Sequence, residues 1–160
     1  MNSTANAFWL GLERSNGFID YFTTGMDGDD WLRQPPGMPN SAIWILGHLA
    51  LSRASFLEQL TGAQAYEDGW KELFGLGVAP QDPSSYPDVE TCRSVLDARL
   101  DDLRSYLETV REEDFDAPPS NPSRVLKTKA DVLVFLTHHE AHHTGALSLL
   151  RRMLGKDRLI

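Results

Sequence analysis

The sequence contains one cysteine, Cys92, among its 160 residues. A single cysteine excludes an intramolecular disulfide and a cysteine-rich zinc site, so a metal site would need other side chains. No run of about 18 apolar residues is present, which argues against a transmembrane helix and a membrane partner. The first residues contain neither a basic segment nor a small-residue cleavage site, so we expect no secretory signal and a cytoplasmic protein.

Basic residues are also scarce in this chain. Lys and Arg number 15 against 23 Asp and Glu, which gives a formal net charge of −8, and the basic residues are scattered. Nucleic-acid binding depends on clustered Lys and Arg that neutralise phosphates. We therefore expect no nucleic-acid partner.

Sustained alternation of apolar and polar residues, which marks a half-buried strand, is missing as well. Instead, apolar residues recur at spacings of three and four in four segments, as is typical of amphipathic helices. These segments cover roughly residues 5–26, 41–61, 88–111 and 128–154. The pattern predicts an all-α fold, an antiparallel four-helix bundle that forms a single domain over residues 1–160.

Two connections in this arrangement are long: 63–87 joins the second and third helices, and 112–127 joins the third and fourth. Loops of this length in a compact domain usually carry function or move. Inside the first connection, Trp70 and Phe74 predict a short helix. Cys92 lies on the apolar stripe of the third helix, which favours a buried thiol over a nucleophile.

All five histidines fall on two of the predicted helices. On a helical wheel His139 and His143 continue the apolar stripe of the fourth helix, whereas His138 and His142 lie at or beyond its edge. Histidines at i and i+4 can point both imidazoles at one metal ion. Two alternatives stay open: two core histidines bonded to a carbonyl and a water, and a ligand pair made of His138 and His142.

His48 on the second helix is the candidate third ligand, because it is the one histidine outside the cluster. The preceding Gly47 would let a neighbouring helix approach closely. Three histidines that leave coordination positions open are typical of catalytic zinc sites. We expect one divalent metal ion, zinc or nickel, on His48, His139 and His143.

The cluster also matches the zinc-peptidase motif H-E-x-x-H, with Glu140 as its glutamate. Longer forms of the motif need a further ligand downstream, but the matching positions hold Ala146 and Leu149. Peptidase activity is therefore not expected. Glu140 either borders the site, as His138 and His142 do, or is solvated, and the wheel favours solvation.

Two stretches, "PPGMPNSAIWILGHLA" and "HHEAHHTGALSLLRRML", resemble the DinB superfamily of four-helix-bundle proteins, in the same order and over essentially the whole chain. That family binds a divalent metal through one histidine of the second helix and an i, i+4 pair of the last, which implies His48, His139 and His143. Family members often have Gly-Gln where this chain has Gly145-Ala146, so the role of that glutamine is not carried over.

The resemblance also implies an activity. Characterised relatives include transferases and isomerases that use small thiols such as mycothiol or bacillithiol. This chain would then be a metal-dependent thiol S-transferase or hydrolase that activates a small thiol cosubstrate or water, and a homodimer. The alternative is a non-catalytic metal-binding or stress-linked bundle protein.

Overall fold

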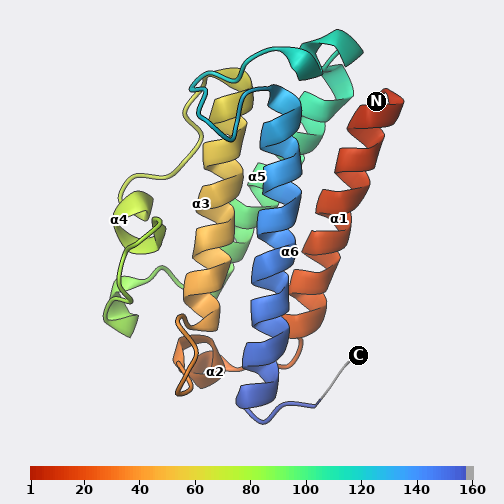
Figure 1. The fold of residues 1–160 in the computed structure, drawn as a ribbon. Coiled ribbons are helices and arrows are strands. Elements are labelled where there is room, and N and C mark those ends of the chain that lie inside the picture. The colour runs from red at the N-terminus through yellow and green to blue at the C-terminus, as the bar shows by residue number, and fades with distance from the viewer. Residues whose placement is uncertain (158–160) are drawn as a thin grey trace.

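The computed structural model describes residues 1–157, and over them the chain is all-helical (Figure 1). Four long helices form the body of the protein: α1 (Ser3–Thr23), α3 (Ala42–Thr61), α5 (Val89–Thr109) and α6 (Lys129–Met153). Short helical turns occupy the connections: α2 (Gly28–Leu32), α4 (Trp70–Phe74) and the 3-10 turns η1 (Pro83–Ser85) and η2 (Glu112–Asp116). The prediction of an all-α fold is confirmed for the described residues.

The ends of the long helices follow from local capping chemistry. The Asp88 side chain accepts the backbone N–H of Thr91 at the start of α5. At the start of α6, Thr128 and Asp131 exchange side-chain and backbone hydrogen bonds as a capping box. Helix α3 ends at Gly62, whose φ of 81° lies in the left-handed region that glycine adopts at low cost. Three of the four predicted helices thus begin or end where the sequence indicated.

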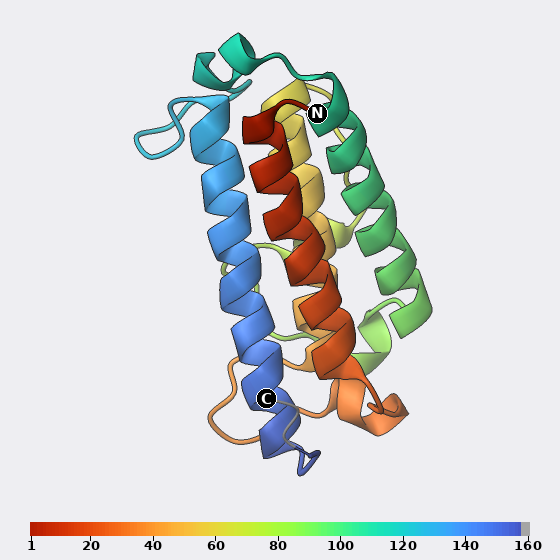
Figure 2. The same cartoon turned by 90° about the vertical axis from the view of Figure 1, so that its right-hand side faces the viewer.

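The directions of the helices differ from the antiparallel prediction. Neighbours α1 and α5 are antiparallel: the Asn2 side chain donates to the Val110 carbonyl at one end, and Arg93 pairs with Asp20 at the other. Helices α3 and α6 are also antiparallel. However, α1 runs parallel to α6, and α3 runs parallel to α5 (Figures 1 and 2). The antiparallel prediction is therefore wrong for two of the four neighbouring pairs.

The physical reason is the connection between α3 and α5. It leaves the far end of α3, passes down the side of the bundle with α4 packed against α3, and returns the chain to the end where α3 began (Figure 1). A long crossover of this kind makes consecutive helices parallel. A short turn would have made them antiparallel.

Helix α3 is the most enclosed helix, and its residues 42–54 are all buried. It packs against α5, α6 and α4, so a side chain at its midpoint faces protein on several sides. Cys92 of α5 is fully buried in the same core, and burial raises the pKa of its thiol to about 12. The prediction of a buried thiol is confirmed. No helix in the described part of the chain is long and apolar enough to cross a membrane.

The short helix predicted around Trp70 and Phe74 is present as α4. It reaches α3 at Gly47, where an added Cβ would lie 2.3 Å from the Phe74 ring. Gly47 therefore permits a close approach to α3, as expected. The group that approaches is the Phe74 side chain of the short helix α4, and not one of the long helices. Tyr86 stacks on Phe74 with ring centroids 5.5 Å apart, which holds the connection against the bundle.

Candidate metal centre

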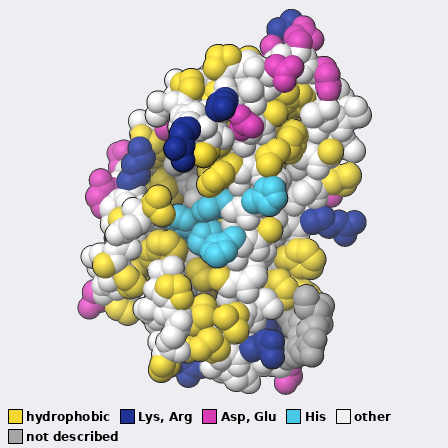
Figure 3. Space-filling model, viewed as in Figure 1, with side chains coloured by type: hydrophobic (Ala, Val, Ile, Leu, Met, Phe, Trp, Pro, Cys, Tyr) yellow, Lys and Arg dark blue, Asp and Glu magenta, His cyan; other side chains and the backbone are white. Residues whose placement is uncertain are grey.

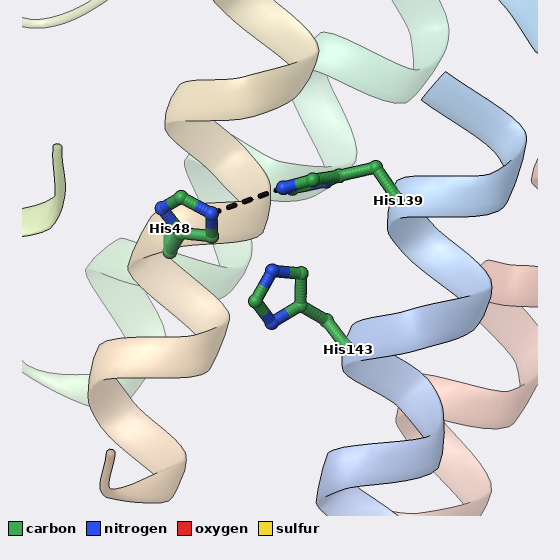
Figure 4. A group of neighbouring side chains, drawn as sticks. All are labelled: His48, His139 and His143. Carbon is green, nitrogen blue, oxygen red and sulfur yellow. Dashed lines mark hydrogen bonds between the residues drawn. The ribbon is translucent and has the colours of Figure 1, made fainter. Parts of the chain in front are cut away.

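Three histidines from two helices meet at the interface of α3 and α6 (Figure 4). His48 comes from α3, and His139 and His143 come from successive turns of α6. One ring nitrogen from each histidine can be chosen so that all lie within 4.8 Å of one another. The Nε2 atoms of His48 and His139 are 3.1 Å apart, close to the separation of two nitrogens bonded to one ion at about 2.1 Å. The cluster could hold a metal ion.

A backbone carbonyl sets the tautomer of His48. Its Nδ1 lies 2.6 Å from the carbonyl oxygen of Phe74, which can only accept, so Nδ1 carries the proton and donates. The Nε2 lone pair is therefore left for the cluster. Histidines that bind metals usually donate their other N–H to such a partner. The Trp44 ring stacks on His48 at a centroid distance of 4.6 Å and fixes the plane of the imidazole.

The three imidazoles are electrically neutral at neutral pH. Burial, together with the neighbouring histidines, lowers the pKa of His139 to about 4 and that of His143 to about 3. Burial also lowers the pKa of His48, against the opposing effect of the Phe74 carbonyl. Neutral imidazoles keep a free nitrogen lone pair, which is the form that binds metals.

His139 is oriented differently from His48. Its Nδ1 is buried and has no hydrogen-bond partner in residues 1–157. The ring is instead flanked by Phe56 and Phe135, at centroid distances of 6.1 and 6.5 Å. The position of this imidazole therefore depends on packing and on the register of α6, and no carbonyl assists it.

The other two histidines of α6 lie outside the cluster. His138 is exposed, and its Nδ1 lies 2.9 Å from the Val134 carbonyl of its own helix. His142 is also exposed, although its ring meets the His143 ring edge-on at 5.0 Å. The structure does not bring His138 and His142 together with His48, so it gives no support to the alternative pair. Of the two, only His142 borders the cluster.

Glu140 is fully buried, so the interpretation that favoured solvation is wrong. Both of its carboxylate oxygens accept hydrogen bonds from Arg53, at 2.6 Å from Nε and 3.2 Å from Nη2. Arg53 is equally buried and also donates to the Asn16 side chain and the Leu96 carbonyl. One ion pair therefore connects α3 and α6 and reaches α1 and α5 as well.

The error has a geometric cause. A helical stripe centred on His139 and His143 also takes in Phe135 and Met153, but these two side chains are 46% and 42% exposed. The buried residues instead include Leu133, Thr144 and Arg151, so the buried arc of α6 is centred about 60° further round the helix, near Glu140. His139 and His143 consequently lie on the flank of the core and are half-buried.

The same ion pair bears on the H-E-x-x-H motif. In a peptidase of that type the glutamate acts as the general base beside the metal. Here both oxygens of Glu140 are bonded to Arg53 inside the bundle. The match therefore covers the two histidines but not a glutamate that is free to act as the base.

A pocket of about 520 Å³ opens beside His48 and His139. The space-filling view shows histidine side chains at the surface of this face, with apolar side chains around them (Figure 3). Besides the two histidines, the side chains that line the pocket are Leu51, Ser52, Ser55, Phe56, Lys71, Leu76, Val78 and Phe135. Sequence reasoning missed Lys71, because only the crossover between α3 and α5 brings this residue next to α3, and residues near it in the sequence do not indicate that contact.

An all-helical fold with a three-histidine cluster defines a class of protein that could bind a metal. The sequence matches the DinB superfamily over residues 12–147, and the chain belongs to this superfamily, which is metal-binding. The crystal structure of a conserved protein from Enterococcus faecalis has a similar fold, with a TM-score of 0.77 at 19% identity, covering 98% of this chain and 99% of that one. No curated protein matches the chain.

Proposed function

We propose that this protein is a metal-dependent enzyme that holds one divalent ion, zinc or nickel, on His48, His139 and His143. The observation that carries the proposal is the His48 Nε2 lone pair, which the Phe74 carbonyl leaves facing two neutral imidazoles. An ion held by three neutral ligands keeps its full positive charge and would bring the pKa of a bound thiol or water toward neutrality. The proposed reaction is transfer of a small thiol, or hydrolysis.

The residues of the pocket favour an external nucleophile. Its lining, as far as the structure describes the chain, contains no cysteine, aspartate or glutamate. Cys92 is buried elsewhere in the core, where burial raises its thiol pKa to about 12, so it is not available as a thiolate. The apolar walls would restrict water and position a thiol cosubstrate or an electrophile next to the histidines. A small thiol supplied from solution fits these features.

A second candidate function has one observation in its favour. Glu140, the one carboxylate of α6 next to the histidines, is bonded to Arg53 and cannot serve as a base. A site without a base suits a bundle protein whose metal is structural or regulatory, such as a stress-linked binding protein. The two functions share the metal and differ in whether turnover occurs.

Elemental analysis of untagged protein, followed by an assay of thiol conjugation, separates these candidates. Catalysis predicts about one equivalent of zinc or nickel, together with conjugation of mycothiol, bacillithiol or glutathione to an electrophile. Conjugation should be lost after chelation and in the triple alanine variant of the three histidines. Stoichiometric metal without turnover of any thiol or ester would favour the non-catalytic protein. Absence of metal binding would overturn both.

We also propose that two copies pair through α1 and α6. Each of these helices exposes large apolar side chains, among them Phe18 at 45% and Leu149 at 51%. Burying such side chains against a second copy is a common basis of homodimers. Sedimentation velocity at micromolar concentration should give the dimer mass, and Phe18→Glu should shift it to the monomer. A monomer mass for the unaltered protein would refute the pairing.

A further inference from the structure

We propose that the pocket beside His48 and His139 binds a small molecule with an apolar body and one acidic group. The acidic group of this ligand forms an ion pair with Lys71. If the proposed function is correct, this ligand class is the substrate class of the candidate metal centre, and to that extent the inference rests on the proposed function. The binding step itself needs only the side chains of the pocket.

The apolar part of the inference comes from the pocket walls. Leu76, in the connection after α4, is 97% exposed, and Phe135 of α6 is 46% exposed. Isolated exposed apolar residues are common on proteins. These two, however, line one pocket together with the half-buried side chains of Phe56 and Val78. An apolar ligand would cover all four side chains at once.

The acidic part comes from charge. The chain has 23 acidic residues and a net charge of −8, yet within residues 1–157 no acidic residue lines this pocket. Among the described residues, Lys71 is the one Lys or Arg that lines it. A carboxylate is the complementary group for an ammonium ion at the edge of an apolar site. The pocket is thus suited to an anion, in a protein whose surface otherwise favours cations.

The surroundings of Lys71 keep its charge available. Its Nζ lies 3.8 Å from the centroid of the Tyr66 ring, and a hydrogen bond to Tyr66 raises the pKa of Lys71. Glu58 and Glu72 act in the same direction at longer range. In the described part of the chain neither carboxylate comes within ion-pair distance of the ammonium group. Lys71 is therefore protonated at neutral pH and able to pair with a ligand.

Two hydroxyl groups add to the polar side of the pocket. Ser52 and Ser55 are on α3, where serine commonly bonds to a carbonyl of the preceding turn. In the described chain neither hydroxyl makes a hydrogen bond with protein. Both line the pocket, so both remain able to bond to a bound ligand. The volume of about 520 Å³ is in the usual range for sites that take small molecules.

Three probes with the same apolar body test this inference: 3-phenylpropanoate, 3-phenylpropan-1-ol and 3-phenylpropan-1-amine. Their dissociation constants are measured by NMR titration, first on chelator-treated protein and then on zinc-loaded protein. On the metal-free protein the acid should bind about fivefold tighter than the alcohol, as expected for an exposed ion pair, and the amine should bind most weakly. Lys71→Met should remove the advantage of the acid and leave the alcohol unchanged.

Matched controls come from exposed residues that do not line the pocket. Lys127→Met changes an equivalent charge outside the pocket and should alter no probe. Leu76→Ser should weaken all three probes together, whereas Val125→Ser, also at an exposed apolar residue, should not. All of these side chains lie outside the core, so the variants are expected to fold.

The outcomes separate this inference from the proposed function. Equal binding of acid and alcohol, or an acid preference that survives Lys71→Met, overturns the role of Lys71. An acid that binds only after zinc is added would be bound at the metal, and this too overturns the inference. Acid binding that depends on Lys71, in a protein without thiol transfer or hydrolysis, would uphold the ligand class and count against the enzyme.

Discussion

Breaking the buried Arg53–Glu140 ion pair should affect both stability and the candidate metal centre. Glu140 directly follows His139 in α6, and Arg53 lies on α3, little more than one turn beyond His48. The pair is fully buried and its two hydrogen bonds are directional, so it fixes how far α6 can slide along α3. Because the candidate ligands lie on these two helices, the same register determines whether their nitrogens converge.

The magnitude follows from burial. Glu140→Gln or Arg53→Met leaves one buried charged group without its partner, which costs about 3–5 kcal/mol. In a domain of this size each kcal/mol lowers the melting temperature by roughly 2–4 °C, so a loss of about 10 °C is expected. The double variant Arg53→Met/Glu140→Met removes both charges and keeps long side chains. Replacing a buried pair in this way is often neutral or stabilising, so the double variant should recover most of the loss.

Two measurements distinguish stability from positioning. Thermal unfolding of the metal-free protein gives the stability, and competition with a chromophoric chelator at 20 °C gives the zinc affinity of the folded protein. The double variant should unfold near the wild-type temperature but bind zinc about tenfold more weakly, a typical loss when groups that orient ligands are removed. Leu103→Ala is the control, because it creates a cavity at a fully buried position of α5. It should lower stability by about 2–5 kcal/mol without changing zinc affinity.

Either of two results would refute this reasoning. Single variants as stable as the wild type would mean that the pair is not buried between the helices. Wild-type zinc affinity in the double variant would mean that the pair contributes stability only and does not position His48 relative to His139.

Four further predictions concern the site and its surroundings. Alanine at any of the three candidate ligands should greatly reduce metal affinity in chelator competition, and alanine at the two exposed histidines of α6 should have a mild effect; the reverse order would mean that the ligands are misassigned. Since the pKa values of His139 and His143 fall from 6.5 to about 4 and 3 on folding, the unfolded chain binds more protons below pH 6.5. Metal-free protein should therefore lose stability from pH 6.5 down to about pH 3, and urea titrations should show less loss in the His139→Gln/His143→Gln variant. Gly47→Ala should displace the Phe74 ring and its carbonyl and weaken zinc binding about tenfold; unchanged affinity would mean that the carbonyl does not orient His48. Cys92 should react with a disulfide reagent only after unfolding, and rapid labelling of native protein would contradict its burial.

The features that the sequence predicted well are those set by nearby residues. The capping box of Thr128 and Asp131 and the left-handed Gly62 depend on neighbours within a few positions, so they could be read from the printed chain. The short helix at Trp70–Phe74 had the same local origin. Helix α2 was not predicted, although its start is also local, since Asp27 and Asp30 form a capping box there.

The features that could not be predicted depend on distant partners. An apolar stripe shows that a helix is covered but not by which neighbour or in which direction, so the parallel pairs α1/α6 and α3/α5 were not foreseen. The burial of Glu140 could not be predicted for the same reason, because its partner Arg53 is on another helix. The histidines were selected in spite of an error in phase, since i and i+4 stay adjacent whichever way the helix is turned.

The crossover that overturned the antiparallel prediction also completes the candidate site. Because α3 and α5 are parallel, the chain has to pass back along the bundle, and it does so next to His48. On this path the Phe74 carbonyl binds the His48 Nδ1, while Lys71 and Leu76 reach the pocket. An antiparallel bundle with a short turn would bring the histidines of α3 and α6 together but would lack these three groups. The long connection is thus the part of the fold that turns a pair of histidine-bearing helices into an oriented site with a pocket.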